Sequence, residues 1–251
     1  MVNLSVVIIT YNEEINIFRC LHSLKGIAEE IIIVDSFSTD KTIEIGTAFN
    51  AKIIFNSFNG YALQKQLGVM EASNDFILSL DADEELTDEL RLRILEIKKN
   101  PLLHAYKLAR LTNYCGKWIK HCGWYPDYQI RLFDRTKGAW ALNKVHESWQ
   151  TKDKNSKLGI LKGDLLHYSY TSISQHIAKI EKYSELSARD AVEKGKNASI
   201  LKILFSPKWH FFSEYILKLG ILDGFYGYII CKMSAYSAFL KYTKIRLYKK
   251  M

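Results

Sequence analysis

The sequence predicts an α/β protein with an open, mostly parallel sheet and helices packed on its strands. Nearly continuous aliphatic runs occupy residues 4–9 and 31–34, and briefer runs occupy residues 53–55 and 76–80. Strands buried on both faces of a parallel sheet have this composition. Helical segments fit between the runs, and this alternation favours right-handed crossovers. With 251 residues and 48% hydrophobic content, the chain can form one large domain and a smaller appendage.

The segments between these strands carry helical signals. Ile17, Leu21 and Leu24 form an apolar stripe. Asp40 is expected to open a second helix, and residues 62–72 are expected to form a third. These patterns predict an α/β domain over residues 1–170 and a helical, basic, amphipathic extension over residues 171–251.

Polar residues follow three predicted strands at the points where the strands end. They are residues 10–13 (Thr-Tyr-Asn-Glu), 35–40 (Asp-Ser-Phe-Ser-Thr-Asp) and 81–84 (Asp-Ala-Asp-Glu). In open α/β sheets, ligands bind beyond the carboxyl ends of the strands. The chain has no glycine-rich dinucleotide fingerprint and no Gly-Lys-Ser/Thr phosphate loop, which disfavours Rossmann dehydrogenases and P-loop proteins.

Asp81 and Asp83 are two carboxylates with i, i+2 spacing directly after a strand. Alone, such residues are more often turn or capping residues, but both can also turn toward one Mg²⁺ or Mn²⁺ ion that takes phosphate oxygens from a substrate. Hydrogen-bonding side chains stand at the neighbouring strand ends and on the third helix. Those suited to a nucleotide are Tyr11, Asn12, Asp35 and Lys65.

Together these tracts resemble the family 2 glycosyltransferases, inverting enzymes with the nucleotide-sugar-binding GT-A fold. The resemblance covers residues 1–170 and rests on residues 6–13, 33–40 and 81–83. It implies that the acidic triplet holds a divalent cation, Mg²⁺ or Mn²⁺, on the donor diphosphate. The nucleotide-binding residues that it implies are Thr10, Tyr11, Asn12, Glu13, Asp35, Ser38, Lys65, Asp81 and Ala82.

Residues 123–133, followed by residues 144–147, look like the branch that adds hexoses to the lipopolysaccharide inner core, the β-1,4-glucosyltransferases. If the first tract is extended, Asp127, Gln129 and Arg131 share one face. Asp127 matches the acidic base motif of the family, and Glu147 is the second candidate for the base. The resemblance also places Gln129, Arg131 and Trp124 at the acceptor or a phosphate.

Two histidines are candidates for a third metal ligand or a phosphate contact, beside Asp81 and Asp83. They are His146 and His167. Each could equally be a satisfied core histidine.

The C-terminal region carries most of the net charge. From residue 200 onward, nine Lys or Arg stand against two acidic residues, which supplies +7 of the net +8. Apolar residues recur from Tyr215 to Leu240 in steps of three and four, and Asp223 is a candidate N-cap, so two amphipathic helices are expected. Their apolar face packs on its own domain, rests on anionic lipid or a lipid-linked acceptor, or contacts a partner helix or a second copy. No segment approaches the roughly 18 to 20 apolar residues that a spanning helix needs.

The predicted function is transfer of a hexose from a nucleotide sugar, UDP being the expected nucleotide, to a glycan or glycolipid acceptor. The acceptor would belong to the lipopolysaccharide core or another envelope polysaccharide. The scattered cysteines and the lack of a leader-like N-terminus predict a cytoplasmic protein, peripheral on the inner membrane face. A catalytically lapsed sugar- or partner-binding module and a metal-dependent phosphoesterase are the alternatives. No nucleic-acid-binding motif accompanies the positive charge, so nucleic acid is not an expected partner.

Overall fold

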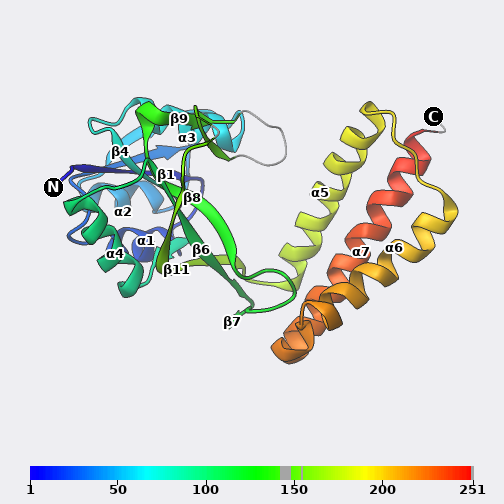
Figure 1. Ribbon diagram of the computed structural model, residues 1–251. Coiled ribbons are helices and arrows are strands. Elements are labelled where there is room, and N and C mark those ends of the chain that lie inside the picture. Colours follow the sequence, from blue (N-terminus) through cyan, green and yellow to red (C-terminus); the bar gives the residue numbers. More distant parts are fainter. Residues whose placement is uncertain (142–147, 154, 250–251) are drawn as a thin grey trace. The chain divides into compact units, whose positions relative to one another are not determined.

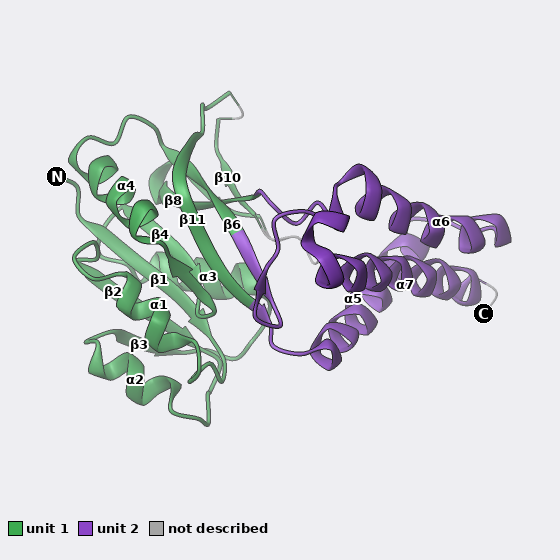
Figure 2. Ribbon diagram, turned by 90° about the horizontal axis from the view of Figure 1, so that it is seen from below, with its two compact units in different colours: residues 1–110, 127–168 green, residues 111–126, 169–251 purple. Residues whose placement is uncertain are grey.

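The computed structural model describes residues 1–141, 148–153 and 155–249. The chain forms two compact units, shown in Figure 2. Unit 1 comprises Met1–Arg110 and Asp127–Tyr168, and unit 2 comprises Leu111–Pro126 and Ser169–Met251. The change of unit at residue 168 lies close to the predicted boundary at residue 170.

Residues 111–126 depart from the predicted division, because they belong to unit 2 rather than to the α/β unit. Tyr114, Ile119 and Cys122 are buried in one cluster with Ile230 and Cys231 of the C-terminal helix. This packing is long-range in sequence, so the local patterns used to place the boundary do not report it.

The parallel part of the sheet in unit 1 agrees with the predicted strands (Figure 1). Its order is β3-β2-β1-β4, and each neighbouring pair is parallel. The strands are β1 (Leu4–Thr10), β2 (Glu30–Asp35), β3 (Lys52–Phe55) and β4 (Phe76–Asp81). All seven residues of β1 are buried, as a strand covered on both faces requires.

Beyond β4 the sheet continues in the order β8-β6-β11-β5, so the whole sheet is mixed. The pairs β4–β8, β6–β8 and β11–β5 are antiparallel. The strands are β5 (Glu84–Leu86), β6 (Ala105–Tyr114), β8 (Asp127–Asp134) and β11 (Gly159–Tyr170), with β7 (Lys117–Trp118) paired to the end of β6. A separate small sheet joins β9 (Gly138–Trp140) to β10 (Trp149–Thr151), and a short 3₁₀ turn (Arg135–Lys137) precedes it.

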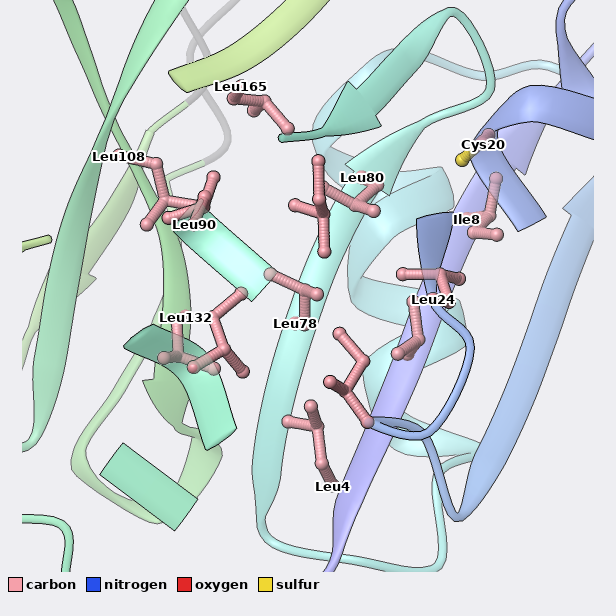
Figure 3. Packing of buried hydrophobic residues seen from close by; sticks show 14 of the residues in the cluster. Leu4, Ile8, Cys20, Leu24, Leu78, Leu80, Leu90, Leu108, Leu132 and Leu165 are labelled. Carbon is pink, nitrogen blue, oxygen red and sulfur yellow. The ribbon is translucent and has the colours of Figure 1, made fainter. Parts of the chain in front are cut away.

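Alternation along β1 divides the core of unit 1 between the two sheet faces. Leu4, Val6 and Ile8 join one buried cluster, seen in Figure 3, and Val7 and Ile9 join another. The first cluster is covered by α1 (Ile17–Ser23), α2 (Thr42–Ala48) and α4 (Asp88–Lys99), and the second by α3 (Tyr61–Met70). The period of two in a strand sends successive side chains to opposite faces, so helices on both faces are needed to bury them.

The described residues of unit 2 form three α-helices, and α7 packs against both of the others. They are α5 (Ile173–Glu193), α6 (Ile200–Phe212) and α7 (Gly224–Tyr248), with a π-helical turn (Ser213–Leu217) and a 3₁₀ turn (Gly220–Asp223) between the last two. Ser172 and Ser199 cap α5 and α6 by accepting from Gln175 N–H and Lys202 N–H.

Asp223 does not act as the predicted side-chain N-cap of α7. Its carboxylate instead accepts from the backbone N–H groups of Lys120 and His121 and contacts His121 Nδ1 over 3.1 Å. The side chain therefore ties residues 111–126 to the start of α7.

The apolar stripe predicted from Tyr215 to Leu240 is only partly buried, since Tyr215, Tyr226 and Ile229 pack on a buried cluster of unit 2. Leu219, Leu222 and Tyr236 on that stripe are exposed. The residues that α7 buries are Gly227, Ile230, Cys231, Ala238 and Ile245. These buried positions include small residues, which hydrophobic periodicity underweights, and α7 contacts two helices at once.

A ring cluster in unit 2 should make stability sensitive to mild acid. Burial, aided by the charge of Lys179, lowers the pKa of His176 to about 4, and the ring packs on Tyr170 while Nδ1 lies 3.0 Å from Tyr114 Oη. A lowered histidine pKa costs stability once the unfolded chain binds a proton that the folded chain does not. This loss begins below about pH 6.5 and reaches roughly 3 kcal/mol near pH 4. In urea unfolding at a series of pH values, His176→Gln should lack this decline, whereas the exposed control His22→Gln should keep it.

Candidate functional site

The predicted strand ends lie side by side at one edge of the sheet in unit 1. Thr10 is paired in register with Asp35, and Ile9 is paired with Asp81. The parallel order β2-β1-β4 therefore brings the three polar tracts together, as predicted from the sequence.

Asp35 is held rigidly by the loop that follows it. The carboxylate is fully buried and accepts from Ser38 N–H over 2.7 Å and from Ser38 Oγ over 2.5 Å. The same loop is joined to the first tract, because Asn12 N–H donates to Ser38 Oγ and Thr39 N–H donates to Asn12 Oδ1, each over 2.8 Å. Tyr11 is 58% exposed beside this frame and is available to a ligand.

Two residues of the predicted nucleotide set serve the local structure. Glu13 accepts from Asn16 Nδ2 over 2.7 Å, and its backbone carbonyl accepts from the N–H groups of Asn16 and Ile17 at the start of α1. Ala82 is buried in the core, and its N–H donates to Ile9 O over 3.2 Å. Glu13 thus supports the start of α1 through its side chain and its backbone, and Ala82 supports the strand end through its backbone.

Asp81 sits between two buried cations. Its carboxylate lies 3.0 Å from Lys65 Nζ and 2.7 Å from Arg131 Nη2. Burial alone would raise the pKa of Asp81, but the attraction of Arg131 and Lys65 outweighs it and lowers the pKa well below its ordinary value. Lys65 therefore lies at the acidic strand end, where it faces the Asp81 carboxylate.

Glu84 is a member of the site that the sequence interpretation missed. It is fully buried, accepts from Arg131 Nη2 over 2.6 Å, and also accepts from the Asp81 backbone N–H over 3.0 Å. Arg110 Nη1 lies 3.6 Å from the same carboxylate. Its position in the sequence could have indicated this role, because Glu84 directly follows the Asp-x-Asp triplet at the end of β4.

Asp127 begins β8 and is oriented by two neighbours. Arg110 donates from Nε and Nη2 to Asp127 Oδ2 over 2.9 and 2.6 Å, and Gln129 Nε2 donates to Oδ1 over 2.7 Å. Arg110 was also missed, and only the register of β6 with β8, which places it opposite Asp127, reveals it. Charges of alternating sign therefore cross the sheet in a charge ladder that consists of Asp127, Arg110, Glu84, Arg131, Asp81 and Lys65.

Asp83, the second carboxylate of the triplet, lies next to His167. Asp83 Oδ2 lies 3.3 Å from His167 Nε2, and the Tyr168 N–H donates to Asp83 O over 2.9 Å. The described residues contain no group of three or more His, Cys, Asp or Glu side chains arranged to hold a metal ion. One carboxylate and one imidazole nevertheless suit Mn²⁺, and Mg²⁺ is often held by one or two carboxylates that leave positions for substrate phosphates. The donors at this position fit a cation that is shared with a diphosphate.

Three predicted site residues lie outside the part of unit 1 that the structure describes. Trp124 belongs to unit 2, where its ring packs on Tyr114 and Tyr170. His146 and Glu147 lie outside the described residues.

The fold and the acidic strand ends define a glycosyltransferase of the GT-A class. The chain belongs to glycosyl transferase family 2, whose model matches residues 5–150. Over 98% of its length it is 33% identical to an uncharacterised glycosyltransferase of Rickettsia typhi, of which 87% is covered. Over 96% of its length it is 32% identical to the lipopolysaccharide core biosynthesis glycosyltransferase LpsC of Rhizobium meliloti, of which 91% is covered.

In structure, the chain is similar to the mannosyltransferase PcManGT from Pyrobaculum calidifontis, determined in complex with GDP-Man and Mn²⁺. The TM-score is 0.58 at 14% identity, and the match covers 100% of this chain and 88% of that one. This likeness concerns the fold, and it confirms the predicted α/β class with C-terminal helices.

Proposed function

We propose that this glycosyltransferase moves a hexose, with inversion, from a UDP sugar to a saccharide acceptor of the lipopolysaccharide core. The observation that carries the proposal is the juxtaposition of a preorganised polar frame around Asp35, an acidic strand end at Asp81 and Asp83, and an oriented carboxylate at Asp127. The similarity to LpsC over nearly the whole chain supports the acceptor class. The family membership gives no support to the phosphoesterase alternative.

The donor would bind along the edge formed by the ends of β1, β2 and β4. Asp35 and the backbone near Asn12 would accept from and donate to the base and ribose, because their geometry is already set by Ser38. Lys65 and Arg131, which now pair with Asp81, would also pair with the diphosphate of the donor. Cations stabilise the negative charge that builds on a leaving phosphate.

Asp83 and His167 are the residues that would hold a divalent cation. When bound, the cation would neutralise part of the negative charge on the departing diphosphate. Asp81 would act mainly by positioning Lys65 and Arg131, because it is already paired with both.

Asp127 would accept the proton of the acceptor hydroxyl as that oxygen attacks the anomeric carbon. Arg110 and Gln129 hold the carboxylate from two sides, which fixes the direction in which the proton is taken. Retention of this arrangement beside the donor edge supports an active enzyme over a lapsed binding module. We place the reaction at the cytoplasmic face of the membrane, where nucleotide sugars are supplied.

Calorimetric titration with UDP tests the donor site. We expect micromolar binding in the presence of Mn²⁺, weaker binding without it, and loss of the Mn²⁺ effect in Asp83→Ala, because Asp83 would help to hold the cation that neutralises the diphosphate. Asp88→Ala, at an exposed position in the first turn of α4, is the control and should bind like the wild type. Binding of GDP but not UDP would change the proposed donor, and the absence of nucleotide binding would contradict the site itself.

A further inference from the structure

Helix α6 presents its apolar side chains outward. None of its residues is buried. Positions separated by three or four residues form one face that continues into the π-helical turn. Their exposed fractions range from 44% to 66%, and we call this set the α6 surface: Leu201, Leu204, Phe205, Trp209, Phe212 and Ile216.

The orientation of α6 is fixed by the packing of its opposite face. The Phe211 ring stacks on Tyr215 at 5.2 Å and meets Tyr228 edge-on at 5.8 Å, and Lys232 Nζ lies 4.8 Å from its centre. Lys202 Nζ lies 4.9 Å from the Tyr242 ring of α7. Because these contacts hold the helix on α7, the α6 surface cannot be buried by rotating α6 in place.

The charges near the α6 surface are positive. Lys208 and Lys218 are exposed between or beside the apolar positions. The two acidic residues of this region are not exposed on the α6 surface. Glu214 is half-buried, and the buried Asp223 accepts hydrogen bonds from the backbone N–H groups of residues 120 and 121. Exposed aromatic and aliphatic side chains flanked by lysines are typical of helices that lie in a membrane interface.

We propose that the α6 surface docks this protein on an anionic bilayer, with the apolar side chains in the headgroup boundary and the lysines at lipid phosphates. Among the described residues, no helix combines the length and apolar character that crossing a bilayer requires, so the helix lies along the interface. A second copy is a poorer occupant, since a twofold contact through this face would bring the lysines of both copies together. The proposal names the surface that would hold the enzyme at the cytoplasmic face of the membrane, the location given under the proposed function. Its evidence comes from unit 2 alone and involves neither the donor nor the acceptor.

Vesicle flotation of the full chain, without nucleotide or acceptor, tests the proposal. The vesicles contain phosphatidylcholine with phosphatidylglycerol, or phosphatidylcholine alone. We expect the wild type to bind the anionic vesicles on the order of tenfold or more tightly than the neutral ones, because each lysine near the surface adds attraction. Phe205→Glu with Trp209→Glu should lose on the order of tenfold or more in binding to anionic vesicles.

Leu92→Glu is the matched control, because Leu92 is a 54% exposed leucine on α4 of unit 1. It should float like the wild type. Circular dichroism and gel filtration establish that each variant is folded. Equal binding by the double variant and the wild type would overturn the proposal. A wild-type dimer that the double variant dissociates, with no vesicle binding, would assign the surface to a second copy instead. Vesicle flotation measures no sugar transfer and no nucleotide binding. A negative result would therefore not affect the conclusion drawn from the UDP titration.

Discussion

Asp127→Asn is expected to lower turnover by a factor on the order of a hundred or more, with UDP binding close to that of the wild type. The amide keeps the size of the side chain, and its oxygen can still accept from Arg110, so the shape of the site should survive. It cannot accept the proton of an attacking hydroxyl at neutral pH, and loss of a general base typically costs a factor of about 10² to 10⁴.

Steady-state rates with a saccharide acceptor, beside calorimetric binding of UDP, separate the two effects. Asp134→Asn is the matched control, because Asp134 ends the same strand and accepts from Thr136 N–H over 2.9 Å. It should retain wild-type turnover. If Asp127→Asn turns over at the wild-type rate, Asp127 is not the base and Glu147 becomes the candidate.

The parallel half of the fold and the donor edge could be predicted because their signals are local. Buried parallel strands require continuous aliphatic runs, and the carboxyl ends of such strands must meet at one edge. Asp35 and Asp81 therefore came together as expected. The tract that begins at Asp127 is a strand, which meets the condition under which Asp127, Gln129 and Arg131 share one face.

The charge ladder could not be predicted, because it depends on strand pairing between distant segments. Arg110 meets Asp127 only through the register of β6 with β8, which shifts between Tyr106 and Lys107. Changing register by one residue moves a side chain to the other face, so no spacing within one strand reports the contact. The outward apolar face of α6 was missed for a related reason, since periodicity identifies an apolar face but not the side on which it lies.

Arg131→Met is expected to lower the free energy of unfolding by roughly 3–5 kcal/mol, the usual cost of removing one partner from a buried ion pair. Arg131 is 3% exposed and donates to both Asp81 and Glu84, so its loss leaves two carboxylates short of a cation. Urea unfolding followed by circular dichroism measures the change. Arg93→Met is the control, because Arg93 on α4 is 43% exposed and pairs with Glu96 at the surface. It should unfold at nearly the wild-type urea concentration.

The pH dependence of Arg131→Met separates lost charge from lost packing. Arg131, with Lys65, keeps the pKa of Asp81 below its unfolded value. The stability that this pairing supplies is therefore full above about pH 4 and is lost as the pH falls further. The difference between wild type and Arg131→Met should narrow by about 1 kcal/mol between pH 5 and pH 3. A difference that stays constant over this range would assign the loss to packing, and a variant as stable as Arg93→Met would contradict a structural role for the charge ladder.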